Sequence, residues 1–440
     1  MIQVQPTVLE GGGIRLEPLA DAHHDGLVAA ASDGHLWDLW YTAVAGPEGM
    51  REYIATALKG QRDGHMMPWV VRDAASGTVI GSTRYHDIVP AIDRVEKAVP
   101  PWTEDDEIRQ FTIAESVLNS FGITSAVEGA TEARDIRTLQ KIAASGKATL
   151  RTGVMFRPEP PADLTAWEAI MSGNGASSGF GDDWLKFAGI KIFYDGGMTL
   201  KTALMRDVYP DSHDNYHGIA QQTPERLKQL ISICNRYGWR VGVHVVGDLG
   251  IDQVLDALES ADKEKSIRDR RFVLIHASLI RPEQMERAHR LGVRIDFQNI
   301  FMWDNAATVE RFLVRATADR AVPTRTLIAK MGLDSLGAGT DFPVNPINPF
   351  LNMYVMVTRK DPNGSVYGAS EAISREQALR LYTSAAAHDT FEEAQKGTIQ
   401  PGKFADFVVL SADYMAVPEE QIKDIKADLT LVGGKMVFQR

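Results

Sequence analysis

The chain has 440 residues, of which 44% are hydrophobic and 24% are charged, and this balance excludes disorder over most of its length. Its formal net charge of −11 argues against DNA, RNA or an anionic membrane as the main partner, because all three carry negative charge. A chain of this length can hold more than one domain, and its single cysteine, Cys234, cannot form an internal disulfide.

The sequence shows no targeting signal. Residues 1–6 lack a basic start followed by an apolar stretch, which a signal peptide would need. Nowhere is an apolar run long enough to span a bilayer. We therefore expect a cytoplasmic location and no membrane partner.

The first 97 residues alternate strand-like runs with helical stretches, and Pro100 and Pro101 close this part of the chain. The adjacent histidines His23 and His24 lie in a helical pattern, where neighbouring side chains point about 100° apart, so we do not expect them to share a metal. His86 lies in a strand-like run, and we interpret it as structural or exposed. The runs cover residues 13–18, 68–72 and 78–84, and the helices lie around 20–32 and 47–62.

Beyond this part, strand-like and helical segments alternate in a regular order. Thr103 and Asp106 form a capping box that predicts a helix to about Asn119. Alternating strands and helices predict parallel strands with right-handed crossovers, and seven strands are one short of a closed eight-stranded barrel. The strand-like runs are 123–127, 150–156, 190–194, 241–246, 272–276, 294–298 and 336–340, with helices such as 224–237 and 253–261 between them.

From Gly397 onward the pattern changes to short strands separated by glycine turns. The strand-like segments lie within 397–410, 428–432 and 435–439. We expect them to form a small antiparallel sheet packed beside the barrel.

Four of the barrel strands contain or precede a residue that can hold or activate a metal. They are Lys191, His244, His276 and Asp341, in that order along the chain. The carboxyl ends of parallel barrel strands meet at one mouth, where α/β barrels keep their chemistry. Imidazole and carboxylate are ligands for a borderline divalent ion such as zinc. One such strand would mean little, but four in series predict a metal site.

These motifs and their flanks resemble the metal-dependent amidohydrolase superfamily, in the branch that includes N-substituted formamide deformylases. The resemblance covers about residues 98–440 and implies a (β/α)8 TIM-type barrel that hydrolyses carbon–nitrogen bonds. The matching segments are Asn119-Ser-Phe-Gly-Ile-Thr-Ser125, Lys191-Ile-Phe-Tyr-Asp-Gly196, His244-Val-Val-Gly-Asp248, His276-Ala277, Gly339-Thr-Asp-Phe-Pro343 and Gly397-Thr-Ile-Gln-Pro-Gly-Lys-Phe-Ala-Asp406.

The resemblance also implies roles for individual residues. Lys191 would be carboxylated and bridge two metal ions, and His244 and His276 would ligate the second ion. Asp341 would bind the first ion and act as general base on the metal-bound hydroxide, then pass the proton to the leaving nitrogen. We place Asp195, Asp248 and Trp303 as candidate substrate contacts.

One expected motif is absent. The family's first strand ends in His-x-His, which supplies two ligands of the first metal, and the sequence contains no His-x-His. The first metal position then keeps only Asp341 and the shared Lys191, and two anionic oxygens hold a transition metal weakly. We therefore expect one divalent ion, zinc by preference, rather than two, and weakened or absent activity.

A second resemblance concerns the N-terminal part. Residues 8–96 resemble the first half of a GNAT-type N-acetyltransferase, through Ile14-Arg-Leu-Glu-Pro-Leu19, Leu36-Trp-Asp-Leu-Trp40, Trp69-Val-Val-Arg-Asp73 and Val79-Ile-Gly-Ser-Thr-Arg84. Acetyl-CoA binding in that fold needs a glycine-rich loop that leads into a helix N-terminus. After Arg94 the chain runs instead into Lys97-Ala-Val-Pro-Pro101.

The sequence thus predicts an incomplete α/β TIM-type barrel with a GNAT-like α/β lobe before it. The expected parts are the lobe at 1–97, the barrel at 98–395 and a small β-sheet subdomain at 396–440. We expect a metal-dependent hydrolase of non-peptide carbon–nitrogen bonds in small molecules, and leave a homo-oligomer open. The alternatives are an inactive barrel that serves for binding or oligomerisation and, ranked lower, an N-acetyltransferase.

Overall fold

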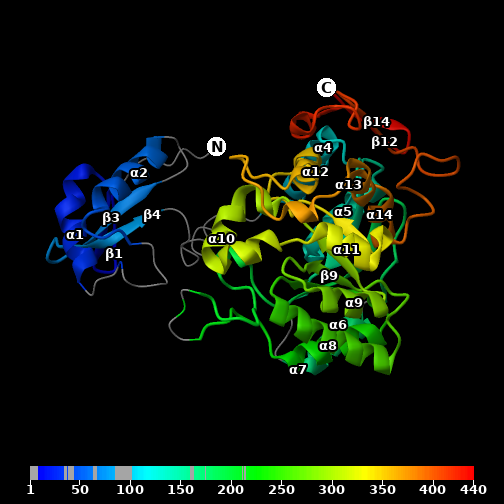
Figure 1. Ribbon diagram of the computed structural model, residues 1–440, viewed down its shortest axis with the longest axis horizontal. Coiled ribbons are helices and arrows are strands. Elements are labelled where there is room, and N and C mark those ends of the chain that lie inside the picture. Colours follow the sequence, from blue (N-terminus) through cyan, green and yellow to red (C-terminus); the bar gives the residue numbers. More distant parts are fainter. Residues whose placement is uncertain are drawn as a thin grey trace. The chain divides into compact units, whose positions relative to one another are not determined.

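The computed structural model describes two compact units, Met1–Pro101 and Trp102–Arg440, each with its own sheet (Figure 1). The residues described are 8–33, 37, 44–62, 67–84, 102–158, 163–173, 175–210, 212 and 215–440. The boundary expected near residue 97 lies outside this range, as does His86. The division into three domains therefore stays a prediction.

The first unit is a four-stranded antiparallel sheet with helices. Its strands lie in the order β1-β2-β3-β4, and buried Leu27, Ile54 and Val70 form the centre of its core. The strands and helices predicted for this unit are confirmed in position. The strand order does not test the resemblance to an acetyltransferase, which stays a prediction. The elements are β1 (Leu9–Gly11), β2 (Ile14–Pro18), η1 (Asp21–His23), α1 (His24–Ser32), α2 (Met50–Arg62), β3 (Pro68–Asp73) and β4 (Val79–Arg84).

The second unit contains a curled sheet of seven parallel strands, as the sequence predicts. The strand order is β11-β10-β9-β8-β7-β6-β5, so each strand pairs with its neighbour in the chain. Within the described residues no eighth strand joins this sheet, which therefore forms a half-barrel with edges at β5 and β11. The strands are β5 (Ser125–Thr131), β6 (Arg151–Phe156), β7 (Leu185–Phe193), β8 (Val241–Val245), β9 (Val273–His276), β10 (Arg294–Phe297) and β11 (Leu336–Ala338).

Helices connect these strands and bury their apolar faces against the sheet. Thr103 caps α4 through the amide of Asp106, as predicted, and buried Leu227, Leu230 and Cys234 share one face of α7. The helices are α4 (Glu104–Ser120), α5 (Ala133–Ala144), α6 (Leu164–Gly173), α7 (Pro224–Arg236), α8 (Asp248–Glu264), α9 (Pro282–Arg290), α10 (Phe301–Asp319), α11 (Thr324–Met331), α12 (Pro349–Thr358), α13 (Arg375–Tyr382) and α14 (Ser384–Ala387), with 3-10 turns η3 (Met198–Leu200), η4 (Leu333–Ser335), η5 (Ala369–Glu371), η6 (His388–Thr390) and η7 (Glu419–Asp424).

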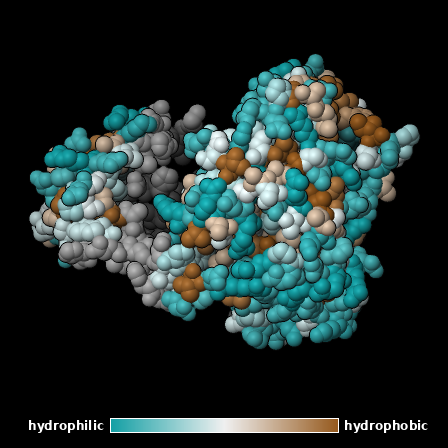
Figure 2. All heavy atoms as spheres, viewed as in Figure 1, coloured by the Kyte–Doolittle hydropathy of each residue, from teal (hydrophilic) through white to brown (hydrophobic). Residues whose placement is uncertain are grey.

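None of the helices in the described ranges combines the length and the apolar character needed to cross a membrane. The surface over α7 and α8 is largely hydrophilic in Figure 2, which fits helices that bury only one face.

A three-stranded antiparallel sheet ends the chain and packs on the start of the parallel sheet. It comprises β12 (Phe407–Leu410), β13 (Ala427–Val432) and β14 (Lys435–Gln439), which lie in the three segments that the sequence predicts. The Thr430 hydroxyl donates to the Asn119 carbonyl at 2.7 Å. Hydrophobic side chains gather on the surface near this sheet in Figure 2, where Val409 and Met436 are exposed.

A buried ion pair fastens this C-terminal segment to the parallel sheet. The Arg151 guanidinium, in β6, donates to both oxygens of Asp406 at 2.7 and 3.1 Å. It also lies over the Phe404 ring, 3.8 Å from the centroid. Both charged side chains are almost fully buried, at 5% and 6% exposure, so each depends on the other for its charge to be compensated.

A second charged cluster fills the base of the half-barrel. Arg240 and Arg294 donate to Asp389, which lies in η6. Asp296 adjoins Asp389, and one of its oxygens is buried without a hydrogen-bond partner. Burial, reinforced by the charge of Asp389, raises the pKa of Asp296 to about 7. Burial also works to raise the pKa of Asp389, but the two arginines outweigh it and hold that pKa at about 2. The pKa of Asp296 is therefore raised and that of Asp389 lowered, so Asp296 is the member of the pair that holds a proton more readily.

Loss of the Arg151–Asp406 pair should cost much of the stability of the second unit. We expect Asp406→Ala to lower the free energy of unfolding by about 3–5 kcal/mol, because it leaves the Arg151 charge buried and uncompensated. Urea unfolding followed by tryptophan fluorescence measures this. Glu286→Ala, which breaks the exposed Lys330–Glu286 pair, is the control and should change the value by less than about 1 kcal/mol. Equal effects of the two variants would contradict the expectation.

Asp296→Asn should change how stability depends on pH. The folded-state pKa of Asp296 is raised from 3.8 to about 7, so between these values the folded protein holds a proton that the unfolded chain releases. Stability of the natural protein therefore falls as pH rises through this window. The variant, which cannot ionise at this position, should show a smaller fall. Denaturation at pH 5 and pH 8 tests it, and a stability difference between the two proteins that is the same at both pH values would count against it.

Candidate metal centre

The four residues singled out in the sequence lie on three neighbouring strands and the loop that follows β11. Lys191 is inside β7, His244 is the penultimate residue of β8, and His276 ends β9. Asp341 comes three residues after β11. In the register of the sheet, Phe193 pairs with His244 and Val245 pairs with His276. Both histidines thus come to the carboxyl ends of adjacent strands.

The two imidazoles are in direct contact. Their ring centroids lie 4.5 Å apart and their planes are inclined at 74°. Burial lowers the pKa of His244 to about 4, and the charge of Lys191 acts in the same direction. Burial also holds the pKa of His276 well below its ordinary value, with added effects from His244 and Lys191. Both rings are therefore neutral near neutral pH, which is the form that binds a metal.

Hydrogen bonds assign the proton on each ring. The Nδ1 atom of His276 lies 2.6 Å from Oε1 of Gln298, so Nδ1 is the donor and Nε2 keeps its lone pair. The Nε2 atom of His244 lies 3.3 Å from the Gly196 carbonyl oxygen, so this ring donates through Nε2 and keeps its lone pair on Nδ1. Each imidazole thus retains one nitrogen able to bind a ligand.

Lys191 is almost fully buried beside these rings. Its Nζ lies over the Phe193 ring, 4.8 Å from the centroid. Burial lowers the pKa of Lys191 to about 8, against the charges of Asp341, Glu128 and Asp296, which raise it. A buried amine with this pKa is neutral in a sizeable fraction of molecules. Neutral amine is the form that carbon dioxide converts into a carbamate, an anionic oxygen ligand.

Asp341 is exposed at the mouth and carries a positive φ of 60°. The protein around its carboxyl group displaces water and raises its pKa to about 6, and Glu128 adds to this while Lys191 opposes it. His276 and Ala277 also have positive φ, of 77° and 45°. Such backbone angles are costly for residues other than glycine and gather at functional sites.

Asp195 lies just after β7 and is fully buried. Its oxygens accept the backbone N–H groups of Leu204, Val246 and Gly247, each at 2.9 Å. Burial raises its pKa to about 7, although the three N–H bonds oppose that shift. These bonds join the end of β7, the loop to residue 204 and the end of β8. These contacts support a role in holding the two strand ends together, and the assignment of Asp195 to substrate stays a prediction.

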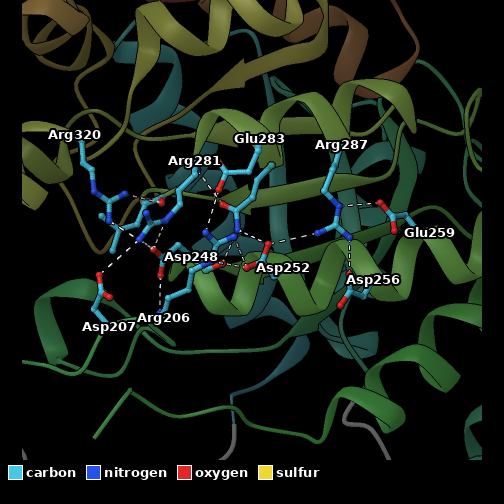
Figure 3. A network of polar contacts seen from close by, with 12 residues as sticks. Arg206, Asp207, Asp248, Asp252, Asp256, Glu259, Arg281, Glu283, Arg287 and Arg320 are labelled. Atoms are coloured by element: carbon cyan, nitrogen blue, oxygen red, sulfur yellow. Dashed lines mark hydrogen bonds and ion pairs between the residues drawn. The ribbon is translucent and has the colours of Figure 1, made fainter. Parts of the chain in front are cut away.

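Asp248 is equally engaged by the protein, in the ion network of Figure 3. This buried carboxylate accepts the Arg206 amide at 2.9 Å and the Arg281 Nε at 2.6 Å, and Arg320 lies 3.7 Å away. The network ties the first turn of α8 to the ends of α9 and α10. The contacts of Asp248 therefore support a role in holding loops, and its assignment to substrate stays a prediction.

The third candidate for substrate contact, Trp303, lies on α10. It is partly buried and meets the Tyr354 ring edge to face at 5.8 Å. The neighbouring Phe301 ring lies beside one of the metal candidates, with its centroid 6.0 Å from that of His276. The apolar wall beside the histidines thus includes Phe301.

The sequence interpretation missed two residues of this site, Glu128 and Gln298. Glu128 lies in β5, and its charge acts on the pKa of both Lys191 and Asp341. The predicted strand ended at residue 127, one position too early to place it on the sheet. Gln298 follows β10 directly. A polar side chain closing an apolar run was the signal that selected His244 and His276, and Gln298 carries the same signal.

The donor set fits a single metal ion only with the help of Lys191. Within the described ranges no three His, Cys, Asp or Glu side chains group closely enough to hold an ion. Two neutral imidazoles with free nitrogens are present, and a carbamate on Lys191 would be the third ligand that a catalytic zinc site requires. His23 and His24 instead bond to Ala20 and Asp25 in their own helical segment.

Comparison with known proteins agrees with this geometry. The model of the amidohydrolase family matches residues 51–438. Protein LONG AFTER FAR-RED 3 of Arabidopsis thaliana is 29% identical over 84% of this chain and 64% of its own length, and N-substituted formamide deformylase of Arthrobacter pascens is 24% identical over 58% and 46%. The crystal structure of an uncharacterized metal-dependent hydrolase from Pyrococcus furiosus has 25% sequence identity and a TM-score of 0.64, covering 77% of this chain and 66% of that one.

The chain spans less than two thirds of the length of the curated relatives it matches. The family model nevertheless extends over most of the chain and begins within the first unit, earlier than the resemblance near residue 98 implied. The chain therefore belongs to the amidohydrolase family.

Proposed function

We propose that this protein is a metal-dependent hydrolase of non-peptide carbon–nitrogen bonds, of the amide and formamide type. The observation that carries the proposal is the contact of His244 and His276, 4.5 Å apart at adjacent strand ends beside buried Lys191. The name of one relative, N-substituted formamide deformylase, supports the substrate class. The shared family supports hydrolysis.

Each residue of the centre has a distinct part in this proposal. His244 would hold the ion through Nδ1 and His276 through Nε2, with Lys191 as carbamate. A divalent ion held there would polarise the substrate carbonyl and lower the pKa of water. Asp341 would take the proton from the attacking water and return it to the leaving nitrogen. Burial of Lys191 and the histidines excludes bulk water, which strengthens the electrostatic effect of each charge.

We further propose one bound ion rather than two, with weak activity. Near the first metal position the structure offers Asp341 and the shared Lys191, with the exposed Glu128 as a third charge acting on both. Carboxylates of this kind, without imidazole, hold a transition metal less tightly than a set that includes two histidines.

Metal analysis tests the assignment of the histidines. Dialysed protein should contain about one divalent ion per chain, because one position has three protein ligands. His244→Ala removes one imidazole and should bring the content towards zero. His289→Ala, an exposed histidine on α9, is the matched control and should leave it unchanged. Two ions per chain, or unchanged content in His244→Ala, would show that the assignment is wrong.

Activity tests the role of Asp341. We expect slow release of formate from N-substituted formamides, and Asp341→Asn should lower kcat/KM by about 10²–10⁴-fold, the usual contribution of a general base. Asp334→Asn alters an exposed carboxylate in η4 and should keep the rate. If metal-loaded protein hydrolyses neither formamides nor N-acyl amines, the protein is a binding module and the proposed activity fails.

A further inference from the structure

Gln298 stands out because both ends of its buried side-chain amide are engaged. It follows β10 and is 7% exposed. Its Oε1 lies 2.6 Å from Nδ1 of His276, and its Nε2 donates to the Asp296 carbonyl oxygen at 3.3 Å. Gln298 thus joins the end of β10 to the histidine that ends β9.

The two contacts together fix the orientation of the amide. Turned over, the amide would place its oxygen against the Asp296 carbonyl oxygen, and two acceptors would then face each other. In the observed orientation the amide oxygen faces His276. An amide oxygen can only accept, so the proton of the ring must be on Nδ1.

We infer that Gln298 is a positioning residue for His276, which keeps the ring proton on Nδ1 and leaves Nε2 free to bind a metal ion. Residues that bond the second nitrogen of a ligating histidine fix both its tautomer and its ring orientation. The claim about the proton concerns the protein alone. The claim about the metal rests on the proposed function.

The position of Gln298 favours this role over a purely structural one. The backbone pairing of β10 ends at Phe297. The contact of Gln298 with His276 therefore lies just past the paired part of the sheet and is made by the side chain. His276 itself has left regular strand geometry, with φ of 77°. The hydrogen bond from its ring to Gln298 ties that ring to the end of the neighbouring strand.

The first experiment measures the tautomer of His276 in metal-free protein. The protein contains 11 histidines, which are labelled with nitrogen-15, and His276→Asn identifies the signals of this ring. Two-bond nitrogen–proton spectra then show which nitrogen carries the proton. We expect the Nδ1–H form in the natural protein and in Gln298→Glu, which keeps an acceptor. Gln298→Met, which has none, should give a mixture of both forms.

The matched control is Gln284→Met, which removes another fully buried glutamine amide, one that donates to the Asp248 carbonyl and to Asp252. It should leave the tautomer of His276 unchanged even where it lowers stability. An Nε2–H ring in the natural protein overturns the inference, and so does a Gln298→Met spectrum that keeps the Nδ1–H form. Neither reading depends on bound metal or on activity.

The second experiment titrates metal-free protein with zinc. Gln298→Met should bind zinc about 10–100-fold more weakly than the natural protein, the usual effect of losing such a partner. Gln298→Glu should restore most of the affinity. Unchanged affinity in Gln298→Met overturns the metal part of the inference. Absence of zinc binding by the natural protein counts against the proposed function, while the spectra still decide whether Gln298 positions the ring.

Discussion

The arrangement of the site depends on the carboxylate of Asp195. Three amide N–H groups from two separate segments, Leu204 on one and the consecutive residues Val246 and Gly247 on the other, converge on its two oxygens. A buried carboxylate without such donors would be too costly to keep. The three N–H groups can converge because the backbone at Gly247 packs directly against the backbone at Leu204. A Cβ at Gly247 would meet the Leu204 backbone at 2.1 Å, so only glycine fits there. The end of β8, and His244 with it, therefore has one position relative to β7.

Burial then determines the pKa values of the basic side chains near the strand ends that Asp195 joins. The same loss of water that lowers the pKa of Lys191 to about 8 also lowers that of His244 to about 4. Three basic groups in one small volume would repel one another if all were charged. The neutrality of the two imidazoles removes most of that repulsion and leaves each ring one nitrogen able to bind a ligand. The Asp248 ion network of Figure 3 holds the connecting loops through the Arg206 amide and the Arg281 guanidinium.

Much of the barrel could be predicted from sequence because its strands are buried on both faces. Continuous apolar runs bounded by glycine mark such strands, and the runs ending in His276 and in Gln298 were placed to within one residue. Asp195 and Asp248 were harder to interpret. A carboxylate that binds backbone amides and one that binds substrate look alike in sequence, since the difference lies in partners brought by distant segments. Glu128 was missed for a related reason, because it is a charged residue that follows the apolar run and still pairs regularly with Val154 of the next strand.

Early strands of the parallel sheet form contacts with residues from much later in the sequence, and this affects folding during synthesis. The partner of Arg151 lies 255 positions later in the chain, and the partner of Arg240 lies 149 positions later. The hydrogen bond between Thr430 and Asn119 joins residues 311 positions apart. A ribosome releases the early strands long before their ionic and polar partners exist. During that interval β5 and β6 hold unpaired charge and exposed apolar surface, the state in which chaperones bind nascent chains. The half-barrel therefore gains these contacts only after the segments that carry Asp389, Asp406 and Thr430 have been made.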